Sequence, residues 1–319
     1  MKILVTDKMA NEAIQVLKDA GHEVTFDEMD HDTLLEEIAS YDALMVRSRT
    51  KATEDIVTAG AKGNIQVIGR AGIGVDNIDI QKAADLGIKV VNSPTGATIS
   101  VAELAIGHML SLSRFLTKAD VSMKNHEWIK KQLKGNELHG KVLGLIGCGN
   151  IGKKTAEYAQ AFGMSVIGYD PFISKEDMAK DAIIKKDEVK EIMKESDYIS
   201  LHIPHIKQTH HIINKEMLSQ MKKTAFIINC ARGGTIDEKA LYESLKNGEI
   251  AGAALDVFEQ EPPKKSPLCT LDNVVMTPHI GASTKEGQVR AGTMCAEQVV
   301  KVLNGQEPDY WVNKKMMEK

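Results

Sequence analysis

The chain has 319 residues, enough for two domains of ordinary size or for one large α/β unit. Lys and Arg number 40 against 44 Asp and Glu, and this net charge of -4 argues against a dedicated binder of nucleic acid or anionic membranes. The four cysteines lie far apart without a CxxC pair, which indicates thiols in a reducing compartment. Because Asp7 comes too early for a signal peptide, we expect a cytoplasmic protein with a small-molecule partner.

The first third of the chain alternates strand and helix patterns. Strands are predicted at Lys2–Thr6, His22–Phe26, Ala43–Val46, Gln66–Gly69 and Lys89–Val91, and helices at Asn11–Ala20, Thr33–Ile38 and Glu54–Ala59. This alternation is typical of a parallel sheet that is covered by helices on both faces. Pro94 and Gly96 then interrupt the pattern, and we place the first interdomain crossing there.

A second alternating series follows a long helix that the pattern predicts from Ile99 to Lys124. Strands are predicted at Val142–Ile146, Ser165–Tyr169, Tyr198–Leu201, Ala225–Asn229, Ala251–Asp256 and Val274–Thr277, and helices at Ile151–Phe162, Asp187–Lys194 and Asp237–Lys246. A last amphipathic helix, Lys285–Leu303, is expected to pack back on the first domain. We therefore predict an α/β fold of two doubly wound parallel sheets, with one domain at 1–96 and 284–319 and the other inserted at 97–283.

A glycine turn joins the first strand of the second series to its helix. Gly147 permits a tight turn, Gly149 allows close approach of a pyrophosphate, and Gly152 allows close packing of helix and strand. Asp170 ends the next strand, at the spacing typical of the carboxylate that binds an adenosine ribose. No Lys or Arg adjoins Asp170, so the pattern favours NAD over NADP. The alternative is a glycine turn that only joins a strand to a helix.

Three loops that follow strands of the second series carry ionisable residues with complementary chemistry. In an open α/β sheet ligands bind beyond the carboxyl ends of the strands, so we expect these loops to converge. Hydride transfer to or from a 2-hydroxy acid requires a cation for the carboxylate and a group that exchanges the hydroxyl proton. Arg232 suits the first role, His279 the second, and Glu261 is the carboxylate expected to orient the imidazole. Each of the three, taken alone, could equally be an ordinary loop residue.

These motifs together resemble one enzyme family, the D-isomer-specific 2-hydroxyacid dehydrogenases, and the resemblance extends over nearly the whole chain. The segments that carry it begin at Arg47, Gly69, Gly147, Asn229, Ala254 and Thr277. The resemblance implies a flavodoxin-like substrate domain, an inserted Rossmann NAD-binding domain, and a catalytic triad of Arg232, Glu261 and His279. It also implies that Asn150, Ile151, Ile203, Cys230, Ala231, Asp256, Gly281 and Ala282 contact the cofactor.

The first domain is implied to bind the substrate. In the family, the loop of Gly72, Ile73 and Gly74 binds the substrate carboxylate through backbone N–H groups. Arg47, Ser48 and Arg49 would face the far end of the substrate, and Gln288 matches a further contact. Two arginines at a strand end could hold a phosphate by charge-assisted bonds, although a pair of solvated surface arginines would look the same in the sequence.

We therefore expect NAD-dependent oxidation of 3-phospho-D-glycerate to 3-phosphohydroxypyruvate, the first step of serine biosynthesis. The alternatives are another 2-hydroxyacid dehydrogenase, acting on sulfolactate, glyoxylate or hydroxypyruvate, and an NADH-sensing module that binds proteins as corepressor-like relatives do. Helix 99–124 and Trp128 are expected to form a homodimer interface, as in the family. Because the chain ends at Lys319, we expect no C-terminal regulatory domain, and the lysine-rich tail from Asn313 is expected to be a solvated, mobile end.

A histidine-rich stretch leaves a further alternative open. His202, His205, His210 and His211 follow a predicted strand and suggest a metal site. No thiolate or carboxylate accompanies them, so a loop without metal is the favoured interpretation.

Overall fold

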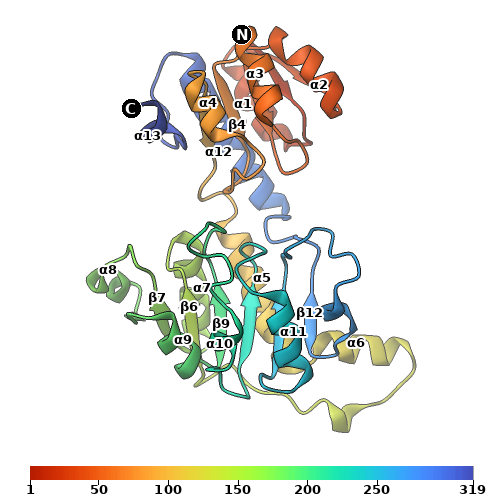
Figure 1. Cartoon of the computed structure of the whole chain (residues 1–319). Coiled ribbons are helices and arrows are strands. Elements are labelled where there is room, and N and C mark those ends of the chain that lie inside the picture. The colour runs from red at the N-terminus through yellow and green to blue at the C-terminus, as the bar shows by residue number, and fades with distance from the viewer. Residues whose placement is uncertain (319) are drawn as a thin grey trace. The chain divides into compact units, whose positions relative to one another are not determined.

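The computed structural model describes residues 1–318, which form two compact units (Figure 1). Unit 1 consists of Met1–Thr98 and residues 282–318, and unit 2 consists of Ile99–Gly281. Each unit contains one parallel sheet that is covered by helices on both faces. The predicted α/β class with two doubly wound sheets is therefore confirmed.

Unit 1 contains a sheet of five strands. The strands are β1 (Lys2–Val5), β2 (Glu23–Phe26), β3 (Ala43–Val46), β4 (Val67–Arg70) and β5 (Lys89–Asn92). Their order, β2-β1-β3-β4-β5 with every pair parallel, is the flavodoxin-like order. The strand order reverses between β1 and β3, and ligands in open α/β sheets bind in the crevice at such a switch point.

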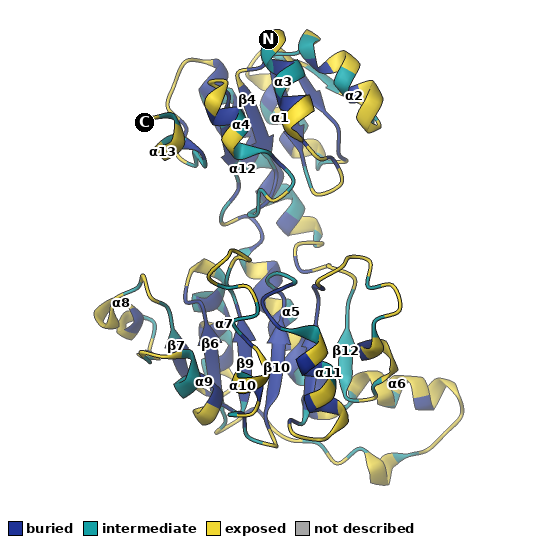
Figure 2. Ribbon diagram, viewed as in Figure 1, coloured by how far each residue is buried: buried dark blue, intermediate teal, exposed yellow. Residues whose placement is uncertain are grey.

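Helices cover both faces of this sheet. They are α1 (Asn11–Asp19), α2 (His31–Glu37), α3 (Glu54–Lys62), α4 (Ile80–Asp85) and α12 (Lys285–Leu303), with a 3-10 turn at Ile38–Ser40. Successive strand residues point to opposite faces, so Ile3 and Val5 pack with α1 and α12, while Leu4 packs with α2, α3 and α4. Figure 2 shows the strands buried between these layers.

The C-terminal tail, predicted from Asn313 as a solvated, mobile end, differs from that prediction at Asn313. Trp311 pairs with Val91 in an antiparallel bridge at the edge of β5. Asn313 is fully buried: its side-chain oxygen accepts from the N–H of Val90 at 2.9 Å, and its nitrogen donates to the carbonyl of Ile88 at 2.9 Å. A short helix, α13 (Lys314–Met317), follows. The tail residues from 310 to 313 therefore close the open edge of the sheet, a need that local composition does not reveal. Lys319 lies outside the described residues.

Unit 2 contains a sheet of seven strands. The strands are β6 (Val142–Ile146), β7 (Ser165–Tyr169), β8 (Ile183–Lys185), β9 (Tyr198–Leu201), β10 (Phe226–Asn229), β11 (Gly252–Leu255) and β12 (Val274–Met276). Their order, β12-β11-β10-β9-β6-β7-β8 with all pairs parallel, contains the Rossmann arrangement and reverses between β6 and β9. The helices α7 (Asn150–Ala161), α8 (Lys175–Lys180), α9 (Val189–Glu195), α10 (Lys215–Leu218) and α11 (Glu238–Lys246) connect them, with 3-10 turns at Lys130–Gln132 and Pro267–Thr270.

The long helix predicted from Ile99 to Lys124 is two helices, α5 (Thr98–Arg114) and α6 (Leu116–Lys124). Phe115 adopts a left-handed conformation at φ +54°, and the two axes are bent by 64°. Most of α5 is buried, whereas α6 is mostly exposed (Figure 2). Among residues 1–318, no single helix is long and apolar enough to cross a membrane, and only this bent pair meets that criterion, by length and composition.

Candidate active site

The glycine turn lies at the switch point of the seven-stranded sheet. Gly147 adopts φ +92°, a conformation that favours glycine, and an added Cβ there would meet the carbonyl oxygen of His202 at the end of β9. An added Cβ at Gly152 would collide with the carbonyl of Gly147, so α7 starts in close contact with the turn. Gly147 and Gly152 therefore allow the helix, the turn and the strand to pack closely, as predicted from the sequence.

The N-terminus of α7 can accept an anionic ligand. Its N-cap residue is Gly149, which has no side chain to cap the first turn of the helix. Nothing lies within 4 Å of a Cβ added there. The first-turn N–H groups of a helix need external partners, and a phosphate supplies them. Asp170 lies beside the turn, where its carboxylate accepts from the N–H of Cys148 at 3.0 Å and from that of Phe172 at 2.9 Å. This combination fits the pyrophosphate and ribose of a dinucleotide.

Two lysines that are not sequence neighbours of Asp170 lie, like Asp170, close enough to Cys148 to act on its thiol. Lys185 comes from the adjacent strand β8, and its ammonium donates to the carbonyl of Ile173 at 2.7 Å. Lys153 on α7 forms an ion pair with Asp181 at 2.8 Å. Both ammonium groups therefore bind protein oxygens in this structure.

The loop after β10 carries Arg232 and is organised by Asn229. The side-chain oxygen of Asn229 accepts from the N–H of Ala231 at 3.0 Å, and its nitrogen donates to the carbonyl of Arg232 at 2.9 Å. The guanidinium of Arg232 donates to the carbonyl of Ala231 at 2.7 Å. Burial raises the pKa of the neighbouring Cys230 thiol, and the charge of Asp256 raises it further, so the thiol stays neutral.

The loops after β10 and β11 lie against each other. An added Cβ at Gly233 would collide with the carbonyl oxygen of Phe258, so only glycine allows this approach. The N–H of Phe258 donates to Glu261 Oε1 at 3.1 Å. The Arg232 loop and the Glu261 loop are therefore held together by backbone packing, as predicted from their positions at the ends of neighbouring strands.

His279 and Glu261 are in direct contact. His279 Nδ1 lies 2.7 Å from Glu261 Oε2, and both side chains are partly exposed. His279 adopts φ +51°, a left-handed conformation that is uncommon for histidine and directs its turn. The two residues are 18 positions apart in the chain, and the pairing that the sequence proposed for them is present in the structure.

Asp256 is fully buried beneath the turn that carries His279. Its Oδ1 accepts from Thr277 Oγ1 at 2.5 Å and from the N–H of Ile280 at 2.8 Å, and its Oδ2 accepts from the N–H of Gly281 at 2.8 Å. The N–H of His279 donates to the backbone carbonyl of Asp256 at 2.9 Å. Asp256 therefore holds this turn from several sides, a role that sequence analysis did not assign to it.

In unit 1, Arg47, Ser48 and Arg49 follow β3 at the switch point between β1 and β3. Arg49 Nε donates to Asp7 Oδ1 at 3.1 Å, and its terminal nitrogens donate to the carbonyls of Thr6 and Met29. The buried Asp7 carboxylate also accepts from the N–H of Arg47 and from Thr50 Oγ1. Asp7 therefore organises the loop that follows β3, a role that only its place at a strand end could have indicated.

The remaining predicted substrate residues lie in the same unit. The loop of Gly72, Ile73 and Gly74 follows β4, and the carbonyl of Ile73 accepts from the side chain of Asn92 at 2.7 Å. Gln288 lies in the first turn of α12 and is partly exposed. Each therefore has a defined place in unit 1, at the end of a strand or at the start of a helix.

The histidine-rich stretch forms hydrogen bonds within unit 2. His205 Nε2 lies 3.0 Å from His210 Nδ1, and His211 Nε2 lies 3.0 Å from Glu259 Oε1. Burial lowers the pKa of His202 to about 4, so its ring is neutral near pH 7. Within residues 1–318, no group of three or more His, Cys, Asp or Glu is arranged to hold a metal ion.

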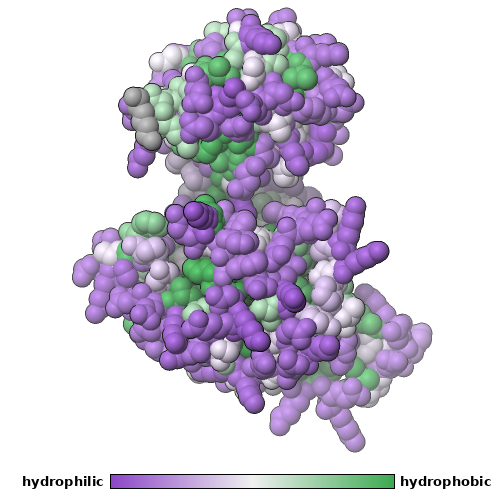
Figure 3. All heavy atoms as spheres, in the orientation of Figure 1, coloured by the Kyte–Doolittle hydropathy of each residue, from purple (hydrophilic) through white to green (hydrophobic). Residues whose placement is uncertain are grey.

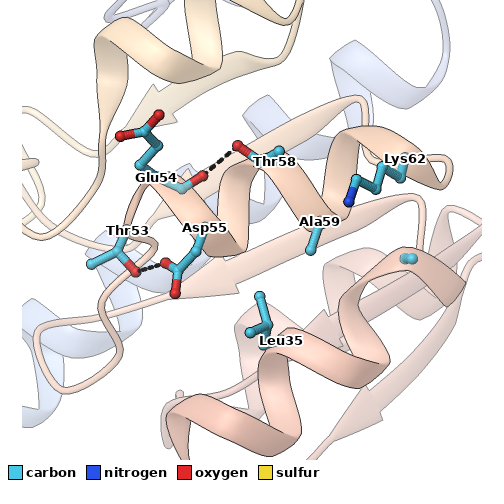
Figure 4. Close-up of a pocket in the computed structure, with 8 residues that line it drawn as sticks. Leu35, Thr53, Glu54, Asp55, Thr58, Ala59 and Lys62 are labelled. Atoms are coloured by element: carbon cyan, nitrogen blue, oxygen red, sulfur yellow. Dashed lines mark hydrogen bonds between the residues drawn. The ribbon is translucent and has the colours of Figure 1, made fainter.

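A hollow of about 770 Å³ lies between α2 and α3 on the surface of unit 1 (Figure 4). Leu35 comes from α2, whereas Glu54, Asp55, Thr58 and other lining residues come from α3 or its start. None of the predicted site residues lines it. The predicted site residues of each unit therefore lie outside this hollow.

Comparison with known proteins adds an independent observation. A family model described as the NAD binding domain of D-isomer specific 2-hydroxyacid dehydrogenases matches residues 106–281. A D-3-phosphoglycerate dehydrogenase of Methanocaldococcus jannaschii is 51% identical over 98% of this chain and 59% of that protein. A hydroxypyruvate reductase of Thermotoga maritima is 49% identical over 95% of this chain and 98% of that protein.

A solved structure is similar over the same extent. A glyoxylate reductase from Paecilomyes thermophila matches with a TM-score of 0.88 and 27% identity, covering 99% of both chains. The chain spans little more than half the length of several phosphoglycerate dehydrogenases that it matches, but nearly the full length of the hydroxypyruvate reductase.

Proposed function

We propose that this chain, which belongs to the D-isomer-specific 2-hydroxyacid dehydrogenase family, oxidises 3-phospho-D-glycerate to 3-phosphohydroxypyruvate with NAD as hydride acceptor. This reaction is the first step of serine biosynthesis. The observation that carries the proposal is the contact of His279 with Glu261 at 2.7 Å, together with the packing of the Glu261 loop against the Arg232 loop. A carboxylate, an imidazole and a guanidinium at one sheet edge are the groups that this chemistry requires.

NAD fits the residues of unit 2. The turn and helix start would hold the pyrophosphate, Asp170 would bind the ribose, and loops at the sheet edge would line the nicotinamide half. The proposed cofactor residues are Gly147, Gly149, Asn150, Ile151, Gly152, Asp170, Ile203, Cys230, Ala231, Asp256, Gly281 and Ala282. When bound, the nicotinamide supplies a hydride acceptor.

The proposed catalytic steps use three side chains. Arg232 binds the substrate carboxylate and the oxygen at C2 by charge-assisted hydrogen bonds. His279 removes the hydroxyl proton through Nε2, which requires a neutral ring with its proton on Nδ1. Glu261 accepts that Nδ1–H at 2.7 Å, fixes the tautomer, and stabilises the imidazolium that forms.

Unit 1 is proposed to select the substrate. We assign the distal phosphate to Arg47, Ser48 and Arg49, the carboxylate to the N–H groups of Gly72, Ile73 and Gly74, and a further contact to Gln288. The location supports this assignment, because Arg47 and Arg49 lie at the β1/β3 switch point. The domains proposed for these roles are 1–96 with 284–319 for substrate and 97–283 for NAD.

The proposed assembly is a homodimer. On α6 and the segment after it, Leu116, Val121, Met123 and Trp128 are between 53% and 78% exposed. Figure 3 shows hydrophobic atoms among the hydrophilic surface near α6. Large exposed apolar side chains on one segment mark an interaction surface, and a second copy of the chain is the proposed partner.

We place the enzyme in the cytoplasm, because its cysteines are free thiols.

Hydroxypyruvate reduction is the second candidate. It is supported by the 49% identity to a hydroxypyruvate reductase that this chain covers over 98% of its length. Hydroxypyruvate lacks the phosphate that Arg47 and Arg49 are proposed to bind, so the two substrates make different demands on unit 1.

A substrate panel tests the proposal. Steady-state kinetics with 3-phospho-D-glycerate, hydroxypyruvate, glyoxylate and sulfolactate should give the highest kcat/KM for the phosphorylated acid. A higher kcat/KM for hydroxypyruvate would favour the second candidate. Binding of NADH without turnover of any acid would contradict an enzyme and favour a protein-binding module.

A further inference from the structure

A histidine outside the proposed catalytic set lies buried behind the turn that carries His279. His108 is on α5, is 3% exposed, and has buried apolar helix neighbours such as Ala105, Met109 and Leu112. A polar ring in such surroundings destabilises the fold unless it forms a hydrogen bond. His108 Nε2 lies 3.2 Å from Thr277 Oγ1, at the end of β12.

The direction of this hydrogen bond follows from the next one. Thr277 Oγ1 lies 2.5 Å from Asp256 Oδ1, and an ionised carboxylate can only accept. The hydroxyl of Thr277 therefore donates to Asp256 and offers only its lone pairs to His108. It follows that His108 Nε2 carries a proton and donates. Burial lowers the pKa of His108, more than Asp256 raises it, which is consistent with a neutral ring protonated on Nε2.

Asp256, which accepts from the Thr277 hydroxyl, is also the carboxylate that holds the His279 turn. Asp256 receives the N–H groups of Ile280 and Gly281, directly after His279 in the sequence. Each added donor restricts the orientation of a buried carboxylate and strengthens the other bonds in the network. The hydrogen bond from His108 thus holds the Thr277 hydroxyl, which is one of the donors that orient Asp256. Asp256 in turn holds the left-handed turn at His279.

We propose that His108 is a positioning residue for the dehydrogenase reaction, acting through Thr277 and Asp256 on the backbone turn that aims His279. The inference rests on the proposed function, because it concerns the placement of the imidazole that exchanges the substrate proton. It assigns no contact of His108 with substrate or cofactor.

Two variants at position 108 separate hydrogen bonding from packing. His108→Leu removes the donor but keeps an apolar side chain of similar size, whereas His108→Gln keeps an amide N–H near the position of Nε2. The rate of hydride transfer in a single turnover, followed by NADH absorbance with the best substrate of the panel, should fall about three- to tenfold in His108→Leu. KM for NAD should change by less than about twofold, and His108→Gln should recover most of the rate.

A double-mutant cycle adds the partner. In a Thr277→Val background, His108→Leu should have no further effect on the single-turnover rate, because the bond that it removes is already absent. Additive losses would overturn the proposal, as would equal losses in His108→Leu and His108→Gln, which would show a packing role. A folded His108→Leu enzyme with the wild-type rate would also overturn it.

Nuclear magnetic resonance of ¹⁵N-histidine provides a readout that does not depend on activity. His108 should be neutral at pH 7 with its proton on Nε2, and its Nε2 signal should shift in Thr277→Val. A doubly protonated ring at pH 7, or a signal unaffected by Thr277→Val, would contradict the geometry. If the wild-type chain turns over no acid, the proposed function fails, and this spectrum still decides whether the hydrogen-bond network exists.

Discussion

The two sheets present different chemistry at the same topological position. At the β6/β9 switch point of unit 2, the turn at Gly147 and the start of α7 present backbone N–H groups. At the β1/β3 switch point of unit 1, the buried carboxylate of Asp7 holds a loop with two guanidinium groups. One topology thus places backbone N–H groups at the switch point of one unit and guanidinium groups at that of the other, where we propose a pyrophosphate site and a substrate-selective site. Changes in unit 2 should therefore alter the chemistry, and changes in unit 1 should alter the choice of acid.

The largest effect is expected at His279. His279→Gln removes the group proposed to exchange the substrate proton, so kcat should fall by about 10²- to 10⁴-fold, while NADH affinity, measured by fluorescence titration, should stay unchanged. His211→Gln is the matched control, because His211 also contacts a carboxylate, that of Glu259, at 3.0 Å in the same unit. Its kcat should stay close to that of the wild type. Comparable losses in both variants would mean that neither imidazole is specific to the reaction.

A smaller effect, on KM, is expected at the arginines of unit 1. Arg47→Met should raise the KM for 3-phospho-D-glycerate by about 10- to 100-fold, the value of one charge-assisted hydrogen bond. The KM for hydroxypyruvate should change little, since this acid carries no phosphate. Steady-state kinetics with both acids measure the difference. Equal increases for both would show that Arg47 does not read the phosphate.

Replacing Arg49 should affect stability as well as substrate binding. Because Arg49 Nε donates to the buried Asp7 carboxylate, Arg49→Met should also lower the free energy of unfolding, whereas Arg47→Met should not. Urea unfolding of the two variants measures this contrast. If both variants are as stable as the wild type, Asp7 does not depend on Arg49 for its place in the fold.

The smallest effect is a pH dependence of stability that arises in unit 2. Because the pKa of His202 is lowered to about 4 in the folded chain, the unfolded chain binds more protons between pH 4 and the ordinary value of 6.5. The free energy of unfolding should therefore fall by about 1–2 kcal/mol as the pH drops from about 8 to about 5. His202→Gln should reduce this slope, whereas His205→Gln, at an exposed position, should keep it. Urea unfolding at several pH values tests this, and an unchanged slope in His202→Gln would contradict the burial of its ring.

Much of this architecture could be predicted from the sequence. Both sheets were predicted from short apolar segments that alternate with helices, because a strand buried on two faces has a distinctive apolar sequence. The residues proposed for catalysis were selected because functional loops follow strand ends, and the structure brings His279 and Glu261 into contact as expected. The family assignment was also predicted from these motifs and is confirmed by the comparisons.

What could not be predicted depended on contacts between distant segments. Helical periodicity continues through Phe115, yet the chain turns there through a left-handed residue that no local signal marks. Asn313 looked like part of a solvated tail because its partners, Ile88 and Val90, are more than 200 positions away. Asp7 and His108 have no motif of their own, since their roles follow only from the partners that tertiary structure brings to them.

The loops of Arg232, Glu261 and His279 are proposed to meet around the C2 oxygen of a bound 2-hydroxy acid. A crystal structure of the chain with NAD and a non-reactive analogue of 3-phospho-D-glycerate measures this most directly. His279 Nε2 should lie within about 3 Å of the analogue's C2 oxygen, with Glu261 still bound to Nδ1 and Arg232 bound to the carboxylate. An analogue bound with its C2 oxygen on other side chains, out of hydrogen-bond reach of His279, would contradict it.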